Sequence, residues 1–142
     1  EYDSTPAQIT AFCEGVRELI RQHPNTRKDL YHVYFNNFGE NSLDVLLLCF
    51  MECADYGSEL KERQSLYLGI MQLADRLGVS FAFPTRTIHM FQQDASTASP
   101  PSFEDPLETG RQLAREISVP LLADLEKLTE SDKTPPDDED EP

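Results

Sequence analysis

The sequence predicts an α+β fold, a ferredoxin-like sandwich with the element order αββαβ, followed by a helical and acidic, disordered C-terminal tail. Three observations predict it. Two stretches with apolar residues at helical spacing flank a pair of alternating, aromatic-rich stretches. A short turn joins that pair, and a third extended stretch follows the second helix. Two helices on one face of a small antiparallel sheet would bury both apolar stripes, and the pattern lacks one strand of the full ferredoxin-like order.

The first predicted helix has clear signals at both ends. Thr5 suits the N-cap, Pro6 the first helical position, and Gln8 completes a capping box. We expect the helix to end near His23, because the residue before Pro24 disfavours helical geometry. Its apolar residues share one face: Ile9, Phe12, Cys13, Val16, Leu19 and Ile20.

Two strands joined by a short turn are predicted next. Residues 32–35 alternate, and the turn at 38–41 contains Gly39 and Asn41, which tolerate positive φ. The second strand is expected at about 42–51. Its centre is apolar throughout, which predicts at least partial cover on both faces of an antiparallel hairpin.

A second helix is expected at 58–77. Ser58 suits its N-cap, Glu59 suits the positive end of the helix dipole, and Gly78 suits a left-handed C-terminal cap. Helical spacing predicts a buried face that comprises Leu60, Tyr67, Ile70, Met71, Ala74 and Leu77. Leu66 and Leu73 widen this face.

The third strand is expected at 79–83, with an extended pattern resuming at 87–90 after an interruption at Pro84. Proline cannot donate to a strand ladder, so it belongs at an edge or a break. Two interpretations stay open: a simple edge strand, or a strand that leaves its sheet to contact another subunit.

The rest of the chain divides by composition. Residues 1–91 form the predicted α/β domain and 92–104 a polar linker. Residues 105–130 form an amphipathic helical segment, which Pro120 is expected to kink or split. Residues 131–142 are an acidic tail that holds too few apolar side chains to order itself.

Charge and composition exclude several classes of function. The chain carries 12 basic and 26 acidic residues, a net charge of −14, which argues against nucleic acid and anionic membrane surfaces as partners. Three cysteines without a disulfide or zinc spacing indicate buried thiols in a reducing compartment. We predict no catalytic, cofactor-binding or metal site. No apolar run approaches the roughly 20 residues of a membrane span, and we expect the chain to be a fragment.

Three stretches together resemble a known family. Residues 33–45 are similar to the paired strands of the C-terminal domain of small-conductance mechanosensitive ion channels. Residues 78–88 resemble that domain's closing strand, and residues 20–24 fit the end of the preceding helix. The resemblance covers about residues 6–91 and leaves the following fifty residues unaccounted for.

The resemblance implies a structural role and no enzymatic activity. Channels of this family are homo-heptamers that open under membrane tension and release solutes on hypo-osmotic shock. This domain would form the lower wall of a vestibule on the cytoplasmic side of the cell membrane, and the membrane-spanning part and a middle β domain would precede it. The closing strand would contact neighbouring subunits through Pro84, Thr87, Ile88, His89 and Met90.

Two other functions remain open on the sequence. Ferredoxin-like sandwiches host ligands at subunit edges, so a ligand-sensing regulatory domain with a polar pocket is one alternative. A protein-interaction adaptor that binds an unknown protein through the helix at 113–128 is the other. The helical segment itself could fold back, pair with a neighbour or bind that partner.

Overall fold

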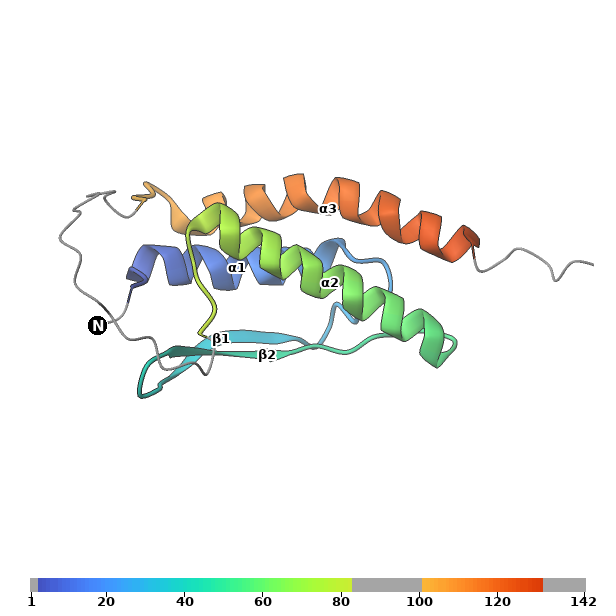
Figure 1. The fold of residues 1–142 in the computed structure, drawn as a ribbon, viewed down its shortest axis with the longest axis horizontal. Coiled ribbons are helices and arrows are strands. Elements are labelled where there is room, and N and C mark those ends of the chain that lie inside the picture. The colour runs from blue at the N-terminus through green and yellow to red at the C-terminus, as the bar shows by residue number, and fades with distance from the viewer. Residues whose placement is uncertain (1–2, 83–100, 132–142) are drawn as a thin grey trace, which may run out of the picture.

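The computed structural model describes residues 3–82 and 101–131. In chain order its elements are α1 (Pro6–Gln22), β1 (His32–Phe38), β2 (Leu43–Leu48), α2 (Tyr56–Leu77) and α3 (Pro106–Ser131). The hairpin forms one layer, α1 and α2 pack beside it, and α3 lies on the far side of those two helices (Figure 1). An α+β fold is therefore confirmed. Its core lies mainly among the three helices, and the hairpin contributes Val33 to it.

The predicted start of α1 is confirmed. The hydroxyl of Thr5 accepts a bond from the Gln8 N–H at 3.2 Å, and the Gln8 side-chain oxygen accepts from the Thr5 N–H at 2.8 Å. The helix ends at Gln22 with His23 as its C-cap. Gln8 has a second role that the sequence did not indicate, because its Nε2 donates to the Leu77 carbonyl at 3.0 Å and ties the start of α1 to the end of α2.

The antiparallel hairpin is also confirmed. Its register runs from Phe38 opposite Leu43 to His32 opposite Leu48. The prediction that both faces of the second strand are covered is wrong, because the side chains of Leu46 and Leu48 are exposed. The helices lie on one face of the hairpin, and within the described residues nothing covers the other face.

The second helix begins earlier than expected, and its buried face agrees only in part with the predicted one. Its N-cap is Asp55 and not Ser58, since the Asp55 carboxylate accepts the Ser58 N–H at 2.8 Å. Gly78 adopts the predicted left-handed cap with φ of 70°. Three residues that were expected to be buried are exposed: Leu60 by 44%, Tyr67 by 52% and Met71 by 58%. The other five predicted residues are buried: Leu66, Ile70, Leu73, Ala74 and Leu77. Glu62, Ser65 and Gly69 complete the buried face of α2.

The third predicted strand does not form in the part of it that the structure describes. Residues 79–82 are irregular, and the rest of the predicted extended stretch, residues 83 and 87–90, lies outside the described residues. The Val79 N–H closes the end of α2 by bonding to the Ala74 carbonyl at 2.8 Å, while the Phe81 ring lies edge-on to Phe12 at 6.4 Å between centroids. A strand needs a hydrogen-bonded neighbour, and the described part of residues 79–83 has none.

The C-terminal helix α3 runs without a break through its internal proline. Pro120 was expected to kink or split this segment, and the structure has one helix there and no split. Proline removes one backbone donor, but the buried side chains on both sides of it, Ile117, Leu121 and Leu125, hold both halves of α3 against the other helices.

Candidate functional site

All five predicted subunit-contact residues fall outside the described residues: Pro84, Thr87, Ile88, His89 and Met90. The structure does describe the chain on both sides of them. It stops at Ala82 and resumes at Pro101, whose ring lies 3.9 Å from where a Cβ on Gly78 would be. The resuming end of the chain thus lies beside the C-terminal end of α2.

Helix α3 is held to α1 by ion pairs between glutamates of α1 and arginines of α3. Glu14 and Glu18 are one turn apart on α1, and Arg111 and Arg115 are one turn apart on α3. Arg111 Nε donates to Glu14 Oε1 at 2.8 Å, and Arg115 Nε donates to Glu18 Oε1 at 3.2 Å. Both carboxylates are buried, so these two ion pairs specify one register of α3 on α1.

Two arginines of α1 itself also bond to the carboxylates of Glu14 and Glu18. Arg17 and Arg21 of α1 reach Glu14 at 3.0 Å each, and Arg21 also reaches Glu18 at 3.0 Å. Burial raises the pKa of Glu14, but hydrogen bonds from Arg111, Arg17 and Arg21 outweigh it, so the net pKa of Glu14 is lowered. The pKa of Glu18 is lowered in the same way, against burial, by Gln22, Arg21 and Arg115.

The backbones of α1 and α3 are also in direct contact. A Cβ on Gly110 would overlap the carbonyl oxygen of Ala11 and lie 3.0 Å from the backbone nitrogen of Gly15. A Cβ on Gly15 would in turn lie 3.1 Å from the Gly110 carbonyl oxygen. Glycine is therefore required at this crossing of α1 and α3.

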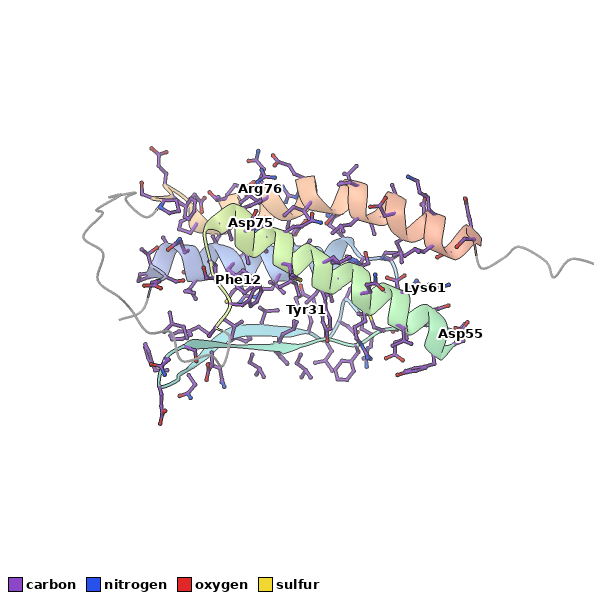
Figure 2. All side chains as sticks on the ribbon, in the orientation of Figure 1. Phe12, Tyr31, Asp55, Lys61, Asp75 and Arg76 are labelled. Atoms are coloured by element: carbon purple, nitrogen blue, oxygen red, sulfur yellow. The ribbon has the colours of Figure 1, made fainter. Side chains whose placement is uncertain are left out.

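On the other side, Arg76 of α2 secures α3. Figure 2 shows Arg76 on the side of α2 that faces α3. Its Nη2 donates to Glu116 Oε2 at 3.1 Å, and about half of each of these two side chains is exposed. This pair adds little stability but agrees with the register set by the ion pairs Glu14–Arg111 and Glu18–Arg115, which we call the buried ladder.

A buried polar cluster lies where α1 ends. The His23 ring is fully buried, with Nδ1 2.8 Å from the Leu19 carbonyl and Nε2 3.1 Å from the Ser65 hydroxyl. Burial lowers the pKa of His23 because the charged ring would lose its hydration. Lys28 donates to the carbonyls of His23 and Thr26 and so satisfies acceptors at the end of the helix. The cluster supports the fold and offers no reactive group to solvent.

Within residues 3–82 and 101–131 we find neither a metal-binding group nor a membrane span. No group of three or more histidine, cysteine or acidic side chains there could hold a metal ion. No helix in the same ranges is long and apolar enough to cross a bilayer. The three cysteines are free thiols.

Comparison with known proteins identifies the family. The model of the C-terminal domain of the mechanosensitive ion channel MscS matches residues 1–81, more than half of the chain. The chain belongs to the MscS family. The matched part ends before α3, so the family model does not account for the helix that packs on α1 and α2.

Curated relatives agree with this family. An uncharacterized MscS family protein of Aquifex aeolicus is 34% identical over 90 residues, which is 63% of this chain and 24% of the relative. The low conductance mechanosensitive channel YnaI of Escherichia coli is 35% identical over 86 residues, or 59% of this chain and 25% of that channel. The large-conductance mechanosensitive channel MscMJLR of Methanocaldococcus jannaschii is 28% identical over 96 residues, 66% and 27% of the two chains. The chain thus spans about a quarter of these MscS-family proteins, and no solved structure matches it.

Sequence reasoning missed the residues that join α1 to α3. A signal was present, because acidic residues four apart and arginines four apart occur in two predicted helices. Such spacings are common on solvated faces, so only the packing of the two helices shows that they meet.

Proposed function

We propose that this MscS-family chain is a vestibule domain of a mechanosensitive channel, placed on the cytoplasmic side of the membrane as part of an integral membrane protein. There it would support assembly, sieving and gating while solutes leave the cell on hypo-osmotic shock. The observation that carries this proposal is the family match over residues 1–81, together with the αββα arrangement of the described residues.

The proposed assembly is a homo-heptamer, by resemblance to the family. Its subunit contacts would use Pro84, Thr87, Ile88, His89 and Met90, since a proline inside a strand pattern suits a strand that leaves its own sheet. The complete domain would be the ferredoxin-like αββαβ sandwich of residues 1–91. Residues 92–104 would link it to the helical segment at 105–130 and to the acidic, disordered tail at 131–142.

The two alternatives have less support from the described residues. An adaptor would need the apolar face of α3 free, yet Ala114, Ile117 and Leu121 belong to the domain core. A ligand sensor would need a polar pocket. A recess of about 440 Å³ between α1 and the hairpin is lined mainly by apolar side chains, with Arg17 as its one charged residue.

Survival after hypo-osmotic shock tests the proposal. Bacterial cells that lack their own channels would carry the full-length parent gene, intact or with residues 6–91 deleted. We expect the intact gene to rescue survival and the deletion to lose that rescue, at matched expression and membrane insertion. Failure of a well-expressed, inserted parent to rescue survival would overturn the proposed function.

A further inference from the structure

The described chain enters, leaves and re-enters its domain at one place. Helix α1 begins after the N-cap Thr5, and α2 ends at Leu77 with Gly78 as its C-cap. Both of these helix ends lie at the same end of the molecule (Figure 1). Pro101, where the described chain resumes ahead of α3, lies next to Gly78. A force between the sequence before α1 and the sequence after α2 is therefore applied across this one end.

The side chain of Gln8 joins the two helix ends there. Its Oε1 accepts the Thr5 N–H at 2.8 Å, while its Nε2 donates to the carbonyls of Leu77 and Gly78 at 3.0 and 3.3 Å. Gln8 is only 2% exposed, so these bonds lie in a medium of low dielectric constant, where they are stronger than in water. A primary amide suits this position because it carries both an acceptor and donors. We call Thr5, Gln8, Leu77 and Gly78 the Gln8 junction.

The backbone of neither helix replaces these bonds. The first N–H groups and the last carbonyl groups of a helix have no partner within it. At the end of α2 the N–H groups of Gly78 and Val79 bond back to the carbonyls of Asp75 and Ala74. Those two bonds close α2 but do not reach α1, whereas the bonds of Gln8 cross from one helix to the other.

An aromatic contact lies beside the Gln8 junction. The Phe81 ring meets Phe12 of α1 edge-on, at 6.4 Å between centroids. Phe81 is nevertheless 46% exposed, so this contact buries only part of the ring. The chain that leaves α2 therefore stays close to α1 as far as residue 81.

We propose that the Gln8 junction is a load-bearing link, through which mechanical force passes between the part of the subunit that precedes α1 and the part that follows α2. This rests on the proposed function, in which a longer channel subunit precedes α1 and contacts between subunits follow α2. Force that takes this route does not pass through the hairpin or along the helices. The link keeps the entry and the exit of the domain together while tension acts on the rest of the channel.

The arrangement of α1 and α2 makes this link depend on the direction of force. The helices are antiparallel, so Tyr56 at the start of α2 lies at the far end of the molecule from the junction (Figure 1 and Figure 2). Force between Asp3 and Ala82, the opening direction, pulls the two helix ends apart and loads the junction first. Force between Asp3 and Tyr56, the sliding direction, moves the helices past one another, and their whole contact shares the load.

Single-molecule force spectroscopy on the whole chain tests this. Click-reactive residues would replace Asp3 and Ala82 for the opening direction, and Asp3 and Tyr56 for the sliding direction, since all three positions are exposed. The unfolding rate is measured at one constant force in each direction, because forced unfolding reports the unfolding rate constant. Comparing the two directions within one variant separates the link from a general loss of stability.

Gln8→Glu removes the link and keeps the cap. Its carboxylate still accepts the Thr5 N–H, but it has no donor for the two carbonyls of α2. We expect unfolding about tenfold faster in the opening direction, the effect of a lost hydrogen bond, and less than about threefold faster in the sliding direction. Gln8→Met, which removes the donor without burying a charge, should show the same dependence on direction and serves where the buried carboxylate prevents folding.

Glu18→Gln is the matched control. It weakens buried hydrogen bonds on the same helix, about three turns beyond Gln8. Its partners Arg21 and Arg115 lie outside the junction, so this variant should accelerate unfolding by similar factors in both directions.

Two results would overturn the inference. One is equal acceleration by the Gln8 variants in both directions, as for Glu18→Gln, which would make the Gln8 bonds ones that only stabilise the fold. The other is an unchanged rate in the opening direction, which would mean that the junction bears no load. Both rates are measured without channel activity, so this inference and the proposed function can fail separately.

Discussion

Arg111 on α3 donates to the buried carboxylate of Glu14 on α1 at 2.8 Å, across 97 residues of sequence. This contact joins a helix outside the family match to one inside it. The bond is charge-assisted and the carboxylate is buried, so removing its charge leaves three arginines facing a neutral side chain.

Glu14→Gln should therefore lower the free energy of unfolding by about 1–3 kcal/mol, the range for a lost hydrogen bond to a charged group. Urea unfolding followed by circular dichroism would measure it. Glu59→Gln is the control, because the partly exposed Glu59–Arg63 pair within one helix should contribute less than about 1 kcal/mol. Equal losses in the two variants would show that the buried ladder does not hold α3.

Gly110→Ala should destabilise the domain although alanine favours helices. The added Cβ would overlap the Ala11 carbonyl and push α3 away from α1, at a cost of about 1–3 kcal/mol typical of overpacking. Gly57→Ala, on the exposed first turn of α2, should be neutral or stabilising. A stabilised Gly110→Ala protein in thermal unfolding would contradict the close crossing of the helices.

Alanine substitutions at two nearby residues of α3 should change the free energy of unfolding by very different amounts if the helix is packed on its own domain. Ile117 is buried and Val119 is 73% exposed. Ile117→Ala should lower the free energy of unfolding by about 2–5 kcal/mol, whereas Val119→Ala should change it by less than about 0.5 kcal/mol. Similar small values for both in urea unfolding would mean that α3 is not docked in solution.

Stability should fall on mild acidification because of His23. Its pKa is lowered by burial in the folded chain from an ordinary value of 6.5, so the unfolded chain binds more protons in the window just below pH 6.5. The free energy of unfolding should be fully retained above that pH and decrease below it, by at most about 1.4 kcal/mol per pH unit. Urea unfolding between pH 8 and pH 5 would measure the slope.

His23→Gln should remove that dependence between pH 6.5 and 5. It should leave a second decrease below about pH 4.5, where Glu14 and Glu18, whose folded pKa values are lowered, lose their charge-dependent stabilisation. A variant with the same slope as the parent between pH 6.5 and 5 would assign the acid sensitivity to another group.

The N-cap of α2 can be tested by comparing the unfolding midpoints of variants at Asp55 and at Ser58. Asp55→Ala should lower the unfolding midpoint more than Ser58→Ala, because the Asp55 carboxylate accepts the Ser58 N–H at 2.8 Å and also faces the positive end of α2. Thermal unfolding by circular dichroism would rank the two variants. The reverse order would restore Ser58 as the cap.

Local signals in the sequence were sufficient for much of the fold. The capping box of Thr5 and Gln8, the left-handed cap at Gly78 and the hairpin turn depend on interactions within a few residues. Such interactions are present whatever the rest of the chain does. The motifs around the hairpin also sufficed to predict the MscS family, which the comparison confirmed.

Other features depended on which elements meet. Helical spacing in α2 allowed two overlapping apolar faces, and the position of α1 and α3 decided that Leu66 and Leu73 are buried while Tyr67 and Met71 are exposed. The sequence likewise could not show that Pro120 leaves α3 continuous, since packing on both sides of it offsets the missing hydrogen bond.

The sequence by itself thus determined the order from α1 through the hairpin to α2, the start of α1, the end of α2 and the family, because these follow from local hydrogen bonding and short motifs. Only the tertiary structure decided that Glu14 and Glu18 meet Arg111 and Arg115, and that Gln8 ties the start of α1 to the end of α2. Contacts between residues far apart in the chain form only when whole helices and strands pack, and periodicity within one element carries no information on its neighbour.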